Sequence, residues 1–85
     1  MVEKRLIGKI VHFYPKISVA VVDLTDTLKV GDKISIEKES GSFEQMVDSM
    51  QIEHQNVSEA KAKDVIGIKT NNKVHPGDKV FKVTP

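Results

Sequence analysis

Short runs of branched apolar residues, separated by turn-forming residues at intervals of about ten, constrain the fold of this chain more than any other feature. Residues 5–14 read RLIGKIVHFY and residues 16–24 read KISVAVVDL, both rich in side chains that favour strands. Further runs of this kind cover residues 29–37, 43–54, 64–70 and 77–83. The pattern predicts an all-β protein, a small closed antiparallel β-barrel of about six to seven strands.

The first run offers two possible apolar faces. Leu6 and Ile10 could share one face, while Ile7, Val11 and Phe13 follow a spacing of two. We therefore expect one strand whose two sides are both partly apolar.

Later runs give clearer expectations for the core. Pro15 favours a turn after the first run, so the first two strands should form a hairpin. The second run suits a buried strand that includes Ile17, Val19 and Val21 as well as the residues that alternate with them. In a later strand, Ile34 and Ile36 are expected to face the core.

Two segments are less regular. The run at 43–54 fits a strand with a bulge, but Phe43, Met46, Val47 and Met50 also have helical spacing. Because the neighbouring segments are all strands, we favour the strand. In the segment 57–63, VSEAKAK, a capping serine precedes good helix formers, which predicts a single helical turn.

Turn residues recur at the start of two strands. The pair Gly31 and Asp32 is repeated as Gly77 and Asp78, each followed by a lysine and an apolar run. Glycine can adopt a positive φ, and aspartate can accept backbone N–H groups of the turn. We expect these four residues to be structural, and we expect bulges or sharp bends at Gly8 and Gly67.

Composition limits the class of protein. A chain of 85 residues has room for one modest core, so we expect a single domain over residues 1–85. It has no cysteine, which suits a reducing cytoplasm, and no apolar stretch long enough for a signal peptide or membrane span. We therefore expect a cytoplasmic, unexported chain.

Charge is unevenly distributed although the net charge is only +1, because both ends are basic and the middle is acidic. If the first and last strands lie side by side, six residues could form one basic face that meets phosphates: Lys4, Arg5, Lys9, Lys69, Lys79 and Lys82. An ordinary solvated surface of mixed charge explains them equally simply, and we favour it.

No arrangement typical of an enzyme is found. His12, His54 and His75 are scattered and lack metal-ligand spacing, and no serine follows a nucleophile-elbow pattern. Gly8 and Lys9 lack the upstream glycine of a phosphate loop. We predict no catalytic residue, no metal, no nucleotide and no cofactor. Phe13 and Tyr14 beside Lys9 could stack on nucleic acid, but the phenylalanines are equally needed for a core.

Several segments together resemble a known barrel. They are residues 28–34, 47–54, 64–68 and 77–80, with Ala60 between them, and they resemble the second-domain barrel of translation GTPases such as elongation factor Tu. The triplets at 43–45 and 49–51 resemble more closely the C-terminal barrel of collagenase-like peptidases, a family linked to RNA modification. The likeness extends from about Gly8 to Val83.

Three positions depart from the translation-factor pattern. An arginine of that family has no counterpart in the segment 20–22, and its pocket glutamate falls at Gln51. Lys63 stands where the family often has glycine, which predicts a turn either without positive φ or under strain.

The resemblance implies a binding module that contacts transfer or ribosomal RNA, or an RNA-associated protein. The residues expected to make the contact are Lys9, His12, Lys16, Gln51, His54 and Lys69. The alternative is an accessory domain that docks by apolar contact onto a separately encoded peptidase-like or RNA-modifying enzyme.

Overall fold

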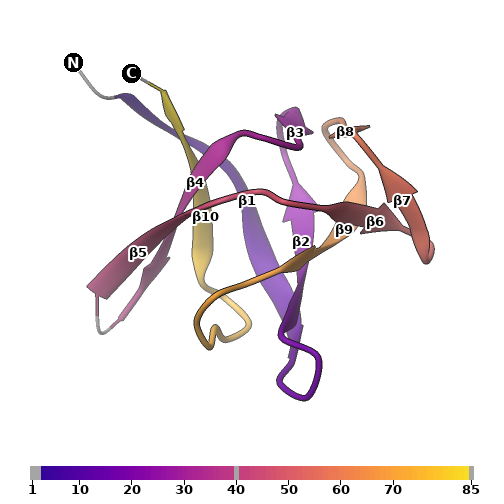
Figure 1. Cartoon of the computed structure of the whole chain (residues 1–85). Helices are drawn as coiled ribbons and strands as arrows, with labels where there is room; N and C mark the ends of the chain where they lie inside the picture. The colour runs from indigo at the N-terminus through magenta and orange to yellow at the C-terminus, as the bar shows by residue number, and fades with distance from the viewer. Residues whose placement is uncertain (1–2, 40, 85) are drawn as a thin grey trace.

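The computed structural model describes residues 3–39 and 41–84, and within them every regular element is a strand (Figure 1). The strands are β1 (Glu3–Tyr14), β2 (Val19–Leu24), β3 (Leu28–Lys29), β4 (Lys33–Lys38), β5 (Gly41–Met46), β6 (Met50–Ile52), β7 (Gln55–Val57), β8 (Glu59–Ala60), β9 (Val65–Lys69) and β10 (Lys79–Thr84). The prediction of an all-β protein is confirmed.

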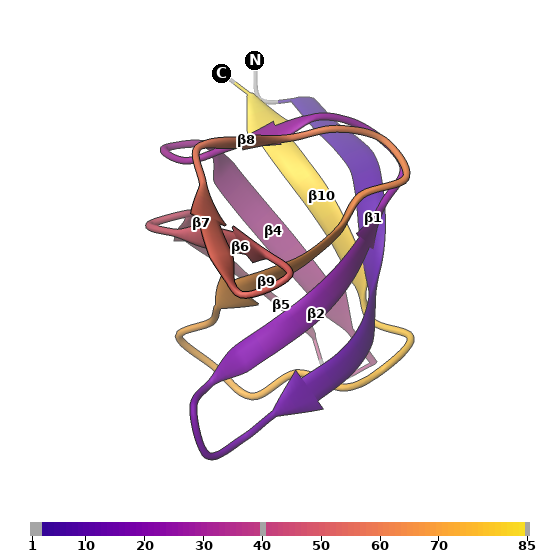
Figure 2. The same ribbon diagram turned by 90° about the vertical axis from the view of Figure 1, so that its right-hand side faces the viewer.

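The sheet is antiparallel and strongly curved. Eight strands follow one another in the order β5-β4-β10-β1-β2-β9-β6-β7, and β3 pairs with β8 separately. Figures 1 and 2 show how strongly the sheet curves around its inner side. Within the described residues no ladder joins the two edge strands, β5 and β7, so the closed barrel stays a prediction. The expected number of strands was too low.

The two less regular segments are both strands. The strand favoured for the run at 43–54 is confirmed, although it is divided into two strands, β5 and β6, and the helical interpretation is ruled out. The predicted helical turn at 57–63 is wrong, because its first half belongs to β7 and β8. Pairing with Met50 and with Leu28 extends this segment, and such pairing outweighs the weak helix preference of a few residues.

Strand β1 carries two bulges, one between Leu6 and Gly8 and one between Ile10 and His12. Each bulge inserts one extra residue, so the inward positions fall at a spacing of three, on Ile7, Ile10 and Phe13. Ile7 and Ile10 are fully buried and Phe13 packs partly against the core. Both faces expected from a regular spacing were therefore wrong: Leu6 is 49% exposed.

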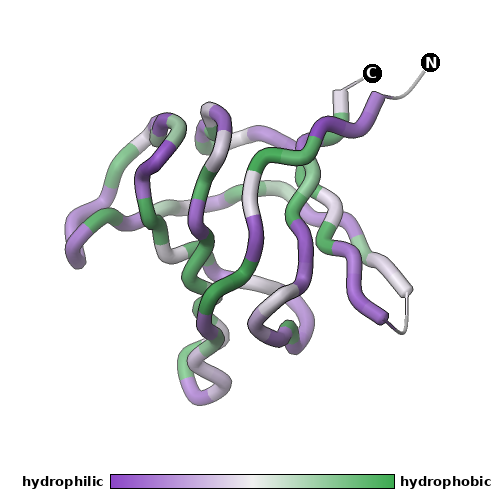
Figure 3. The backbone as a smooth tube through the Cα atoms, turned by 180° about the vertical axis from the view of Figure 1, so that it is seen from behind, coloured by the Kyte–Doolittle hydropathy of each residue, from purple (hydrophilic) through white to green (hydrophobic). Residues whose placement is uncertain are grey.

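The core lies between the inner surfaces of the curved sheet. Ile34 and Ile36 are fully buried, as predicted, and lie opposite Val80 and its neighbours of β10. In β2 the buried residues are Ala20, Val22 and Leu24, whereas Val19 and Val21 face outward and Ile17 is 60% exposed in the preceding turn. Figure 3 shows the resulting alternation of apolar and polar residues along the backbone.

The structure repeats one four-residue turn before three strands. Its segments are Lys29–Asp32, Lys61–Asp64 and His75–Asp78, and each ends on an aspartate whose Oδ2 accepts the N–H of the first residue at 2.9 Å. The third residue has positive φ in all of them: 96° at Gly31, 77° at Lys63 and 96° at Gly77. A positive φ at this position is the mark of a type II turn. Lys63 therefore adopts the strained form of the turn.

The glycines predicted to bend strands behave differently. Gly8 lies beside the first bulge, as expected, and a Cβ there would lie 2.7 Å from the carbonyl oxygen of Asp23. Gly67 pairs regularly with Val21, so the predicted bulge there is wrong.

A single side chain bridges the gap beside the edge strand β5. Gln45 is buried, and its Nε2 donates to the carbonyl oxygen of Lys69 at 2.8 Å while its Oε1 accepts the N–H of Asn71 at 2.8 Å. The amide thus takes the place of a backbone ladder between β5 and the segment after β9. Val74, a few residues after this contact, is buried and belongs to the core.

Replacing Lys63 by glycine should stabilise the protein. Lys63→Gly removes the cost of positive φ, which is partly offset by the larger entropy of glycine in the unfolded chain, for a net gain of about 1 kcal/mol. Urea denaturation measures the change. Ala62→Gly, one residue earlier, is the control and should lose about 0.5 to 1 kcal/mol. Equal destabilisation by both variants would contradict the assignment of strain to Lys63.

Removing the Gln45 amide should weaken the fold at the gap. Gln45→Ala leaves a backbone donor and acceptor without partners, which costs about 2 to 3 kcal/mol. Gln55→Ala, at an exposed position of β7, should change stability by less than about 0.5 kcal/mol. Hydrogen exchange gives a local test: the amide of Asn71 should exchange faster in Gln45→Ala alone. An unchanged exchange rate would show that the bridge is not a stabilising contact.

Candidate binding face

Four of the residues expected to bind a partner lie on one side of the sheet, over β1, β2, β9 and β6. His12 pairs with Val21, Val21 with Gly67, and Gly67 with Gln51, so these residues form one row across four strands. A parallel row joins Tyr14, Val19 and Lys69. A third row contains Lys9, Asp23 and Val65. Figure 2 looks onto this side, and we call these three rows the outer face.

The centre of the outer face is apolar. Val19 and Val21 are half-buried, Tyr14 is 48% exposed and Val65 is 51% exposed. The ring of Tyr14 meets that of His12 edge to face, with centroids 4.4 Å apart. Outward residues of an antiparallel sheet are ordinarily polar, so an apolar centre indicates a contact surface.

Gly67 lies in the middle of this surface. It occupies the row between Val21 and Gln51 and carries no side chain. A Cβ at this position would lie 3.3 Å from Cγ1 of Val19, which is tighter than an ordinary contact. The side chain of Val19 therefore packs close to the glycine, and a larger residue here would press against it.

The predicted binding residues do not form one compact site. His12 and Gln51 are three strand spacings apart, or ~14 Å, so a small ligand does not reach both. Gln51 is further engaged through Nε2, which donates to Oδ1 of Asn56 at 3.1 Å. Lys16 lies in the turn between β1 and β2, and His54 lies in the turn between β6 and β7 with a φ of 66°. The last two stand at the ends of the outer face.

Sequence reasoning missed the apolar centre of this face. Val19 and Val21 were expected in the core, Tyr14 was considered only as a residue that stacks on nucleic acid, and Gly67 was expected to bend its strand. The bulge between Ile10 and His12 reverses which residues of β1 point outward, and the sequence contains no clear mark of it. The one available signal was that apolar residues occupy every position of residues 19–22, more than one buried face requires.

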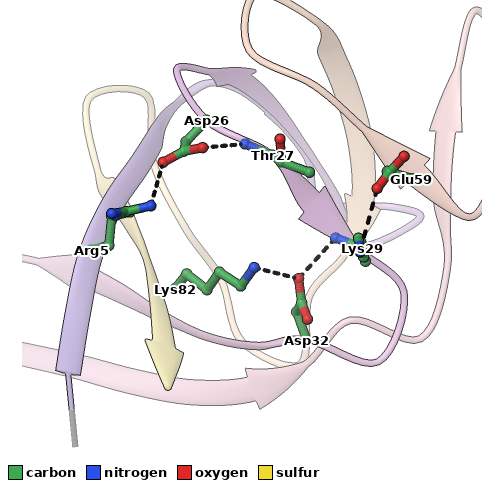
Figure 4. A network of polar contacts seen from close by, with 7 residues as sticks. All are labelled: Arg5, Asp26, Thr27, Lys29, Asp32, Glu59 and Lys82. Atoms are coloured by element: carbon green, nitrogen blue, oxygen red, sulfur yellow. Dashed lines mark hydrogen bonds and ion pairs between the residues drawn. The ribbon is translucent and has the colours of Figure 1, made fainter. Parts of the chain in front are cut away.

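The structure divides the basic residues that could have formed one face, in keeping with the favoured expectation of a surface of mixed charge. Strands β1 and β10 do pair. However, Lys4 pairs with Glu37 at 3.6 Å, Arg5 with Asp26 at 3.2 Å, and Lys82 with Asp32 at 3.3 Å. The last two pairs belong to a polar network at the end of the sheet near β3 and β8 (Figure 4). Lys69 lies on β9, away from these pairs.

No metal centre is found in the described residues. They contain no cluster of three or more histidine, aspartate or glutamate side chains able to hold a metal ion. They also form no helix long and apolar enough to cross a membrane. The outer face combines an apolar centre with polar ends.

The chain is similar to part of a known protein. The chain is 46% identical over 76 residues to an uncharacterized protease of Methanocaldococcus jannaschii, and the match covers 88% of the chain but 19% of that protein. The chain therefore spans about a fifth of the length of this curated relative. No family model matches the sequence.

Two solved structures share the fold, and both are C-terminal domains of a Geobacillus thermoleovorans protein described as a U32 peptidase. One has a TM-score of 0.86 with 16% identity, covering 92% of this chain and 91% of that domain. The selenomethionine variant has a TM-score of 0.85 with 15% identity, covering 89% and 96%. The resemblance to a C-terminal domain of peptidases is thereby supported at the level of fold.

Proposed function

We propose that this chain is a non-catalytic accessory domain that docks onto a separately encoded peptidase-like enzyme. The observation that carries the proposal is the match to one part of a protease, about a fifth of its length, rather than to a whole enzyme. Fold similarity to C-terminal domains of a peptidase points in the same direction. A domain that is one part of an enzyme in a relative can act here on a partner encoded by another gene.

The geometry offers a surface for this docking. The apolar centre of the outer face, formed by Tyr14, Val19 and Val21 around Gly67, has the character of an interface core. The polar residues at its ends, including Gln51 and Lys69, suit a rim. Apolar contact then supplies most of the binding energy.

RNA binding is the second candidate function. Its support is the exposed Tyr14 beside His12, with Lys69 in the row of Tyr14. A base can stack on such a ring while lysine meets a phosphate. Ion pairs of Lys4, Arg5 and Lys82 reduce the charge left for phosphates, which is why we place this function second. This second hypothesis includes the proposal that the sheet closes into a barrel of the elongation-factor type.

Affinity capture from a native lysate tests the partner class. The chain should retain a peptidase-like enzyme, and treatment with nuclease should not release it. Retention that nuclease abolishes, or capture without any peptidase-like enzyme, would count against the proposal.

Variants of the outer face should then weaken binding to the recovered enzyme. Val21→Lys puts a charge in the apolar centre and should lower affinity by about thirtyfold, the size of a central contact. Ser42→Lys adds the same charge at an exposed position of β5 and should change affinity by less than about twofold. Equal loss in both variants would show that charge, and not the outer face, determines binding.

Salt dependence separates the two functions. Docking by apolar contact should change little between about 50 and 200 mM salt, whereas binding that neutralises several phosphates falls steeply over this range. Fluorescence anisotropy with transfer RNA and with the recovered enzyme makes the comparison. A steep decrease for the enzyme as well would argue against an apolar interface.

A further inference from the structure

Two lysines stand directly opposite each other at one end of the outer face. Lys9 of β1 and Lys79 of β10 are register partners, and both are exposed. Like charges directly opposite in an antiparallel pair repel each other. The same row continues to Asp23 of β2 beside Lys9 and to Glu37 of β4 beside Lys79, and Glu37 is engaged by Lys4 at 3.6 Å. Neither forms an ion pair with a described residue, although Lys4, Arg5 and Lys82 on the same strands all do.

A hollow of about 300 Å³ lies between these lysines and the neighbouring segments. It is lined by Leu6, Gly8, Lys9, Asp23, Thr25, Gly77 and Lys79. Two backbone hydrogen bonds fix its geometry, since Ile10 donates to Asp78 and Gly77 donates to Ile10, at 2.8 and 2.7 Å. The turn that contains Gly77 is thus held against β1, and the two lysine backbones are held in place on adjacent strands.

The lining specifies the chemistry of a ligand. Lys9 and Lys79 supply two positive charges and Asp23 supplies one negative charge, so the hollow suits a single anionic group. Thr25 adds a hydroxyl that can donate to an oxygen atom. Leu6, 49% exposed, gives the hollow an apolar wall, and Val65 lies two strands away in the row of Lys9. A carboxylate next to apolar side chains fits these features.

We propose that this hollow receives a carboxylate from the surface of the partner protein. The proposal rests on the proposed function, because it treats the hollow as the charged end of the docking surface. A protein brings apolar side chains together with its carboxylate, which matches Leu6 and the apolar centre of the outer face. The carboxylate relieves the repulsion between Lys9 and Lys79 and fixes the orientation in which the partner docks.

Acetate serves as the probe of the hollow itself. In amide NMR spectra at constant ionic strength, acetate should cause saturable shifts at Thr25, Gly77 and Lys79. Lys9→Gln and Lys79→Gln should each weaken this binding by about three- to tenfold. Lys73→Gln, which removes one charge from an exposed loop, should leave it unchanged. Shifts that do not saturate, or that persist in both variants, would overturn the proposal.

The recovered enzyme tests whether the partner uses the hollow. Lys9→Gln and Lys79→Gln should each lower its affinity by about three- to tenfold, and Lys73→Gln should not. Circular dichroism and thermal unfolding confirm that the variants fold. Unchanged affinity in both variants overturns this inference while leaving the proposed function intact, because the enzyme still binds.

Two further outcomes are decisive. If acetate binds but no peptidase-like enzyme is retained, the proposed function is wrong. The assignment of the hollow to a carboxylate of that partner is then wrong as well. If transfer RNA binds instead, and loses affinity in Lys9→Gln and Lys79→Gln but not in Lys73→Gln, the anionic group is a phosphate. That result also overturns the carboxylate assignment.

Discussion

The structure depends on the close approach of β1 to β2 at Gly8. This residue pairs with Val80 of β10 and with Leu24 of β2, so the two halves of the sheet meet there. A Cβ would lie 2.7 Å from the backbone oxygen of Asp23 and 3.0 Å from Cγ1 of Val22. Backbone atoms cannot move aside as a flexible side chain can, so glycine is required here for β1 to pair with both β10 and β2.

The bulges of β1 determine which of its residues face the core and which face outward. Each one adds a residue and increases the local bend, and together they direct Ile7, Ile10 and Phe13 inward. The same shift turns His12 and Tyr14 outward, beside Val19 and Val21 of β2. The same bulges therefore determine both the core residues of β1 and the residues that lie beside the apolar centre of the outer face. The repeated turns before β4, β9 and β10 then fix where the remaining strands begin.

Much of the fold follows from local chemistry in the sequence. The short apolar runs predicted an all-β chain, and the regular alternation around Ile34 and Ile36 placed them in the core. Local sequence patterns predict the structure wrongly where pairing with another strand determines the conformation. Bulges leave no clear trace in the apolar spacing, so the faces of β1 were assigned wrongly. Residues 57–60 have weak helix preference, but pairing with β6 and β3 makes them strands.

The candidate site was predictable only in part for the same reason. The family resemblance suggested His12, Gln51 and Lys69, and the register places them on one face with Lys9. The apolar centre between them depends on which way β1 and β2 turn their side chains. The separation of paired from unpaired lysines likewise depends on which carboxylates the curved sheet brings within reach.

Methyl NMR of the chain, alone and with the recovered enzyme, tests the central claim most directly. If the outer face is the docking surface, the methyl signals of Val19, Val21 and Val65 should shift or broaden on binding, while those of Val30 and Met46 stay unchanged. A response confined to Val30 and Met46, with the three valines unaffected in the bound state, would contradict the account.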